Sequence, residues 1–176
     1  IKQLTNGGLI VIGSGHYSIT QTISLSPGLV IRGAGTGGSQ LPNVIGYGAT
    51  ILNGSGINYI FTGSSITGLR IQDLSVENAG LLQLGGSNVL GGSQLYIENI
   101  WGINPPEWLI ELYNSINGVI TNVWSEGVNG QGLLHIAQNY TQSPWNLGNM
   151  EITQVGGPAG DKYGFLIENT ANVTQQ

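Results

Sequence analysis

Cysteine is absent from this chain of 176 residues, so no disulfide can stabilise the fold and no thiolate can bind a metal. Cations are nearly absent as well: the four are Lys2, Arg32, Arg70 and Lys162, and the net charge is −5. This balance argues against nucleic acid or an anionic membrane surface as a partner. No apolar run approaches the ~20 residues that a helix needs to cross a bilayer, so we expect no membrane insertion.

Charged residues of both signs are scarce, at 7% of the chain, against about a quarter in ordinary globular domains. The chain is nevertheless not typical of disorder, because 40% of its residues are hydrophobic and they recur periodically. A protein with few carboxylates has little stability to lose in acid, where each shifted carboxylate must be protonated. Together with three glycosylation sequons, at Asn53, Asn139 and Asn172, this favours an extracellular protein from an acidic habitat.

The chain contains many short stretches in which apolar and polar residues alternate. The clearest is Ile66–Asn78 (ITGLRIQDLSVEN). The alternation breaks at Gln72-Asp73 and then resumes, which predicts two short strands that meet at a bend. The expected core residues of this stretch are Leu69, Ile71, Leu74 and Val76. The pattern returns at intervals of 26, 23 and 32 residues, counted between its central residues Ile71, Ile97, Ile120 and Ile152. A drifting repeat of strand and turn predicts a parallel β-solenoid, whose stacked coils bury one continuous core.

Polar residues occupy the bend position of each repeat: Asp73, Asn99, Asn122 and Gln154. Successive coils of such a fold lie roughly 4.8 Å apart, so side-chain amides at this position can hydrogen-bond to one another in a ladder. We expect the ladder to be structural, because it satisfies polar groups where the strands bend.

The first coil carries a more specific pattern. A strand at 9–12 is followed by Gly-x-Tyr-x-Ile at 15–19, a second strand, Pro27-Gly28, and Ile-Arg-Gly-Ala-Gly at 31–35. This order resembles the first coil of right-handed parallel β-helix proteins of the pectate-lyase-like group, which includes polysaccharide lyases, glycoside hydrolases and viral tailspikes. The resemblance covers residues 8–35, and the later coils share its rhythm. It implies an all-β fold, a right-handed parallel β-helix.

We expect a single domain over residues 1–176. It comprises a first coil (1–35), a loop rich in Gly, Pro and Asn (36–50) and further coils with loop excursions (51–176). A coil still under way at the last residues predicts that the domain is a fragment of a longer helix. Its open strand edges and low surface charge predict a homo-oligomer.

Three glutamates are the predicted catalytic residues. Glu77 and Glu126 each lie four residues after a bend and two coils apart, which places their backbones roughly 9–10 Å apart. The carboxyl groups of inverting glycosidases are about 6.5–9.5 Å apart. Glu98 lies in the intervening coil and could replace either residue, as could Glu107 and Glu111. The alternative is that all three are solvated surface acids.

Tryptophans strengthen the prediction of a carbohydrate site. Trp101 and Trp124 each follow a bend asparagine by two residues, so we expect them to face outward from consecutive coils. Trp108 and Trp145 are expected in neighbouring loops. Exposed indole faces pack well against the C–H face of a sugar, so Trp101, Trp124 and Trp108 are the predicted substrate-binding residues. The alternative is that loops or a neighbouring subunit cover them.

Other chemistries lack their sequence patterns. His16 and His135 are isolated, and we expect both to be ordinary hydrogen-bonded residues. No cluster has the spacing of metal ligands, and no phosphate loop or Ser–His–Asp order is present, so we predict no metal and no cofactor. The calcium-and-arginine pattern of pectate lyases and the paired aspartates of polygalacturonases are not matched either.

The leading hypothesis is a viral tailspike or receptor-binding segment on the virion surface, in contact with other virion proteins. It would bind host-surface glycan, and a glycosidase activity would cleave it. The low charge and the sequons resemble the tailspikes of archaeal spindle-shaped viruses. The alternatives are a secreted cellular polysaccharide lyase or hydrolase, and a non-catalytic adhesin or surface-structure spacer.

Overall fold

The fold is all-β. The computed structural model describes residues 7–37, 48–127, 130–138, 150–157 and 163–169, which form fifteen strands and no helix. Within these ranges, therefore, no helix exists that is long and apolar enough to span a membrane.

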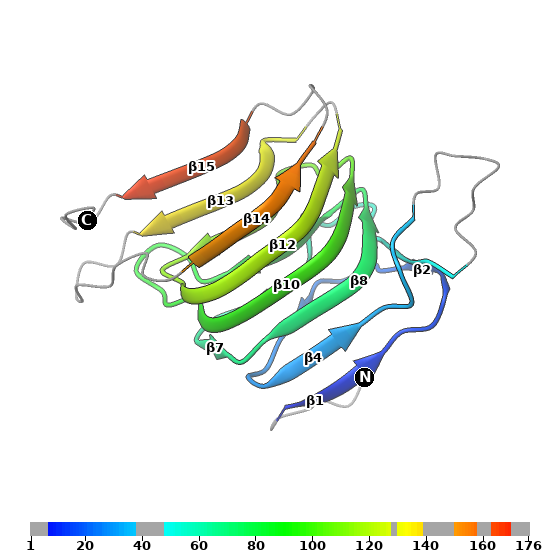
Figure 1. Cartoon of the computed structure of the whole chain (residues 1–176), viewed down its shortest axis with the longest axis horizontal. Helices are drawn as coiled ribbons and strands as arrows, with labels where there is room; N and C mark the ends of the chain where they lie inside the picture. Colours follow the sequence, from blue (N-terminus) through cyan, green and yellow to red (C-terminus); the bar gives the residue numbers. More distant parts are fainter. Residues whose placement is uncertain (1–6, 38–47, 128–129, 139–149, 158–162, 170–176) are drawn as a thin grey trace.

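Two sheets contain all fifteen strands (Figure 1). Sheet 1 has nine strands: β1 (Gly8–Val11), β2 (Gly15–Ser18), β4 (Leu29–Arg32), β5 (Thr50–Asn53), β7 (Ile66–Thr67), β8 (Arg70–Glu77), β10 (Gly92–Ile103), β12 (Ile116–Glu126) and β14 (Met150–Gly156). Sheet 2 has six: β3 (Ile23–Ser24), β6 (Tyr59–Gly63), β9 (Gly80–Leu84), β11 (Trp108–Tyr113), β13 (Gly132–Gln138) and β15 (Tyr163–Asn169).

Every pairing between these strands is parallel. The chain contributes a strand to sheet 1, crosses to sheet 2, and returns to lie beside its previous strand, as β10, β11, β12 and β13 do in turn. We call each such circuit a pass. Consecutive passes are therefore neighbours in both sheets, which the predicted repeat requires.

The register confirms the alignment of the repeats. Ile31, Ile71, Ile97, Ile120 and Ile152 occupy one row across β4, β8, β10, β12 and β14. All but Ile152 are at most 1% exposed, and Ile152 packs at the edge of the same cluster. The other predicted core residues are buried with them: Leu69, Leu74, Val76, Leu95, Ile100 and Val123. Each buried aliphatic side chain contributes about 1.5–3 kcal/mol, so this single core stabilises the fold.

Sheet 1 bends where its polar residues were predicted to lie. Asp73, Asn99, Asn122 and Gln154 all have positive φ, between 50° and 60°, a conformation that Asn and Asp adopt more readily than most residues. Asn99 Nδ2 donates to Asp73 Oδ1 over 2.8 Å, and Asn122 Nδ2 donates to Asn99 Oδ1 over 2.6 Å. We call these three residues the amide ladder. Gln154 shares the backbone conformation, but no hydrogen bond joins it to Asn122, so the predicted ladder ends one step earlier.

The register makes a testable prediction about stability. Replacing Ile97 by Ala should lower the free energy of unfolding by about 2–5 kcal/mol, because a fully buried side chain would leave a cavity. Val119→Ala is the matched control, since Val119 is only partly buried and lies on β12 beside the core residue Ile120. Urea unfolding should show a clearly smaller loss for Val119→Ala. Equal losses would contradict the assigned faces of sheet 1.

Candidate functional site

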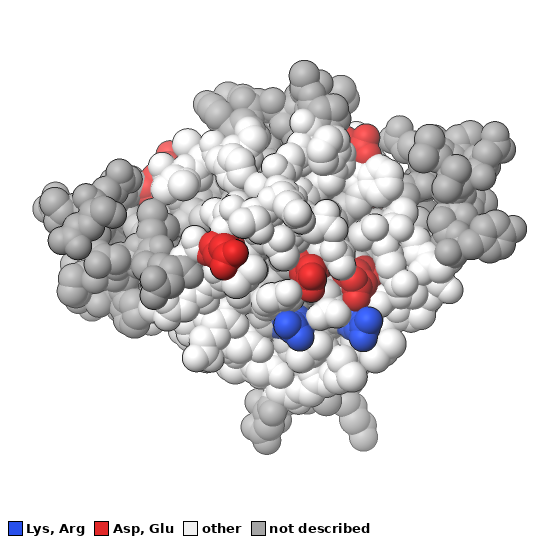
Figure 2. Space-filling model, in the orientation of Figure 1, with Lys and Arg blue, Asp and Glu red and all other residues white. Residues whose placement is uncertain are grey.

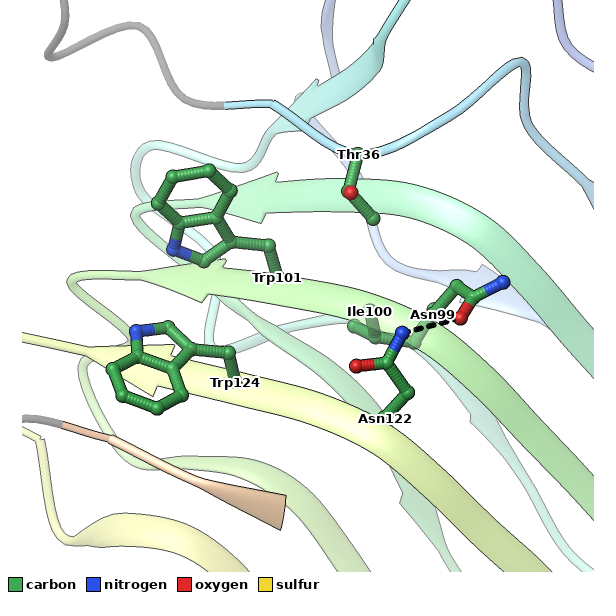
Figure 3. A pocket seen from close by; sticks show the side chains of 6 residues that line it. All are labelled: Thr36, Asn99, Ile100, Trp101, Asn122 and Trp124. Carbon is green, nitrogen blue, oxygen red and sulfur yellow. Dashed lines mark hydrogen bonds between the residues drawn. The ribbon is translucent and has the colours of Figure 1, made fainter. Parts of the chain in front are cut away.

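A pocket of about 320 Å³ lies on sheet 1 just beyond the bend (Figure 3). It is lined by Thr36, Asn99, Ile100, Trp101, Asn122 and Trp124. Thr36 belongs to the segment after β4, and the other five belong to β10 and β12. None of the six side chains is charged, so the wall offers aromatic faces, amides and one hydroxyl.

Trp101 and Trp124 form one wall of this pocket, and we call them the indole pair. They are register partners on β10 and β12, which confirms the expectation that they lie in one column on consecutive strands. Their rings lie side by side on the same face, with the six-membered rings turned away from each other (Figure 3). Trp124 is 46% exposed and Trp101 is partly buried. The Nε1 of Trp101 is buried, and no described residue accepts a hydrogen bond from it.

Gly156 lies beside the Trp124 ring on the next strand. It is the register partner of Trp124 on β14. A Cβ atom at this position would lie 3.4 Å from Cζ3 of the indole, an ordinary van der Waals contact.

Asn99 and Asn122 of the amide ladder line the pocket opposite the indole pair, and the ladder is anchored outside the pocket on the carboxylate of Asp73 (Figure 3). Asp73 accepts hydrogen bonds from Asn99, from Gln72 Nε2 over 3.1 Å and from Arg32 Nε over 3.2 Å. Burial acts to raise the pKa of Asp73, but these three donors outweigh it and hold the pKa below its ordinary value of 3.8. Asp73 is therefore ionised at neutral pH.

The predicted catalytic glutamates are only partly brought together. Glu77 and Glu126 both pair with Ile103, so they share a column two strands apart. Glu126 is partly buried. The side chain of Glu77 is only 4% exposed, and its Oε2 lies 3.2 Å from Nε2 of His16. Glu77 is thus not the solvated surface acid that the alternative interpretation required.

Glu98 lies on the other side of the bend from Glu77 and Glu126. It is the register partner of Gln72 and Thr121, before Asn99 in the strand. Its hydrogen bond raises the pKa of Tyr96, whose ring packs under the guanidinium of Arg70 at 4.1 Å. The structure therefore keeps Glu98 apart from the other two glutamates.

Other predicted residues lie elsewhere. Trp108 is not in a loop beside the indole pair: it begins β11, is 6% exposed, and stacks on His135 with 5.0 Å between ring centroids. Asn53 ends β5, and its Oδ1 accepts hydrogen bonds from the amide of Ser55 and from Asn78. Asn139, Trp145 and Asn172 lie outside the described residues.

Sheet 2 carries a titratable cluster that the sequence analysis missed. His135 lies between two carboxylates, with Nδ1 2.9 Å from Glu111 Oε1 and Nε2 3.0 Å from Glu168 Oε2. Both ring nitrogens face carboxylates, an arrangement that favours the protonated imidazolium because this form donates from both nitrogens. We call these three residues the His135 cluster. Its members are 24 and 33 residues apart, close to the repeat interval, and that spacing could have revealed it.

The carboxylate of Glu111 is in contact with four hydrogen-bonding side chains. Besides His135 it accepts hydrogen bonds from Tyr59 Oη (2.9 Å), Gln83 Nε2 (2.7 Å) and Tyr113 Oη (2.9 Å). Burial acts to raise the pKa of Glu111, but the four donors lower it below its ordinary value of 4.5. A carboxylate held in this way is a poor proton donor. The His135 cluster therefore acts as a structural link across β6, β9, β11, β13 and β15.

The carboxylate of Glu111 also raises the pKa values of His135 and Tyr113. The hydrogen bond to Glu111 is the main cause that raises the pKa of His135 above 6.5, and burial opposes it. Burial and the Glu111 carboxylate together raise the pKa of Tyr113 to about 12. The described residues contain no group of three or more His, Asp or Glu side chains arranged to hold a metal ion.

No protein-family model, no curated protein and no solved structure matches this chain significantly.

The His135 cluster predicts an acid optimum for its contribution to stability. His135 contributes fully below its ordinary pKa of 6.5, and the contribution is lost as pH rises through its raised folded pKa. The contribution of Glu111 to stability is complete above its ordinary pKa of 4.5, and it is lost as pH falls through its lowered folded pKa. The stability difference between wild type and His135→Gln should thus be largest between these values.

Urea unfolding at about pH 5.5 and about pH 8.5 checks this. We expect the difference to shrink at the higher pH. His16→Gln is the control, because it removes the other histidine of the chain at a half-exposed side chain. A difference for His135→Gln that grows between the two pH values would refute the ion-pair assignment.

Proposed function

We propose that this chain is a right-handed parallel β-helix that binds carbohydrate at the pocket between the indole pair and the amide ladder. The two parallel sheets, the alternation of the chain between them and the shared register support the β-helix. The observation that carries the binding proposal is the register pairing of Trp101 with Trp124, with Trp124 46% exposed at a pocket.

Leaving an indole in water has a free-energy cost. A large apolar side chain that stays exposed forgoes a burial free energy of about 1.5–3 kcal/mol. The exposed Trp124 and the partly buried Trp101 lie on adjacent strands and create an aromatic surface whose rings are spaced by the sheet, not by flexible loops. A pyranose offers a C–H face to such a surface and hydroxyls to the amides beside it, so both walls find complementary groups.

The setting that we favour is an extracellular spike, a viral tailspike or receptor-binding segment that attaches to host-surface glycan. Scarce charge, three sequons and a rigid stack of strands support this setting. A secreted polysaccharide lyase or hydrolase would need acid–base groups beside the pocket. An adhesin or spacer would need none, and binding without turnover would favour it.

Binding can be tested with one substitution. Trp124→Ala should weaken glycan binding by about 1–3 kcal/mol, because one large aromatic contact is lost. Val89→Ala is the control, since Val89 is an apolar side chain of similar exposure, 45%, outside the pocket. Calorimetric titration with host-surface glycans should show a loss for Trp124→Ala only. Equal affinity of both variants and wild type would place carbohydrate binding elsewhere or exclude it.

Hydrolysis is a second candidate, supported by the shared column of Glu77 and Glu126. We expect Glu126→Gln and Glu77→Gln to abolish glycan release while binding is retained, because an amide keeps the shape but transfers no proton. Release of glycan from host glycoprotein is the measurement. If wild type binds without release, the protein is a lectin-like spike. Release that neither change affects would move the active site away from these residues.

A further inference from the structure

We infer that the pocket accepts neutral sugars and discriminates against anionic ones, because the amide ladder presents a hydrogen-bond acceptor to the ligand. This inference rests on the proposed carbohydrate binding and specifies the chemical class of its ligand. It follows from the direction in which the ladder's hydrogen bonds run.

Asp73 fixes that direction. A carboxylate only accepts hydrogen bonds, so Asn99 must turn its Nδ2 toward Asp73 and its Oδ1 toward the next strand. Asn122 must then turn its own Nδ2 toward that oxygen. The orientation of a side-chain amide is usually ambiguous, but here each one is set by the anion at the head of the ladder.

The last oxygen of the ladder is therefore an acceptor. Oδ1 of Asn122 points toward the side of the pocket where the indole pair lies (Figure 3). Gln154 holds the next ladder position on β14, but it does not donate to Asn122, and Oδ1 has no donor among the described residues. Hydrogen bonds that run in a chain polarise one another, so the negative head strengthens this terminal acceptor.

A ligand that donates to this oxygen therefore suits the ladder. A hydroxyl of a neutral hexose, or the N–H of an N-acetylhexosamine, can donate to Asn122 Oδ1 while its C–H face packs on Trp124. A carboxylate or sulfate cannot donate and would face the acceptor with a negative charge.

No described cation is available to neutralise such a ligand. Arg32 is bound to Asp73, and Arg70 packs over Tyr96. Figure 2 shows the basic side chains of this face beside acidic ones, with most of the rest of the described face uncharged. The pocket itself has no charged lining residue. Unlike a polyuronate site, which pairs carboxylates with cations, this surface favours a ligand without charge.

The test compares sugars that differ only in the charged group. Oligogalacturonides and galactose oligomers of the same linkage form one such pair, and oligoglucuronides and glucose oligomers of the same linkage form another; N-acetylglucosamine oligomers complete the panel. Calorimetric titration of wild type at low salt should show each uronate binding at least about tenfold more weakly than its neutral partner.

Asn122→Gly tests the acceptor itself. Glycine suits the φ of 50° at this position, so the variant removes the amide with little backbone strain. Affinity for the neutral sugar should fall about fivefold to tenfold, and the discrimination should shrink. Asn117→Gly is the matched control, because Asn117 has φ of 53° on the same strand and does not line the pocket. Asp73→Asn, which keeps the shape but removes the anion, should also reduce discrimination and serves if Asn122→Gly does not fold.

The outcomes separate this inference from the proposed function. Uronates that bind as tightly as neutral sugars, in a manner that depends on Trp124, would overturn the inference and leave carbohydrate binding intact. Unchanged neutral-sugar affinity in Asn122→Gly would overturn it as well. If no oligosaccharide binds wild type, or if binding does not depend on Trp124, the proposed function fails and the inference fails with it.

Discussion

Parallel, in-register pairing of successive passes is the constraint on which the rest of this structure depends. It places each residue beside the residues at the same repeat position in the neighbouring passes. Residues of one kind at one repeat position therefore form a column across the sheet. Isoleucines make an apolar column, as at Ile71, Ile97 and Ile120. A buried polar side chain in such a column can be satisfied by its neighbours along it. The amide ladder is headed by the carboxylate of Asp73 in sheet 1, and the His135 cluster is centred on the carboxylate of Glu111 in sheet 2.

The two polar columns differ in what they leave for a ligand. Glu111 is enclosed by donors and gives a structural link whose charges favour mildly acidic conditions. The amide ladder is open at Asn122 and lies across the pocket from the indole pair. Sheet 1 therefore combines an aromatic surface with a directed acceptor, and this combination supports recognition of a neutral sugar. Rigid strands hold both groups, so little ordering entropy is lost on binding.

Much of the fold could be predicted because it follows from the local alternation of apolar and polar residues and from the spacing of the repeats. The bend at Asp73, the isoleucine row and the column of Trp101 and Trp124 all follow from counting residues along the repeat. Trp108 was misplaced because the adjacent Pro105 and Pro106, which cannot lie in a central strand, favour a loop, whereas β11 begins at Trp108, two residues after them. The His135 cluster was missed because each member looks isolated in sequence. Only stacking brings His135 and Glu111 together, and burial of Glu77 depends equally on contacts from a distant strand.

The most direct test of in-register stacking is a disulfide between two strands, and the absence of cysteine gives it a clean background. Thr121 and Thr153 are register partners on β12 and β14, with their hydroxyl oxygens 2.9 Å apart. The double change Thr121→Cys and Thr153→Cys should form a cross-link under mild oxidation, because neighbouring strands lie within the Cα range of a disulfide, about 4.4–6.8 Å. The pair Thr121→Cys and Glu151→Cys is displaced by two residues on the same face and should not. Preferential cross-linking of the displaced pair, measured by peptide mass spectrometry, would contradict the register and the columns derived from it.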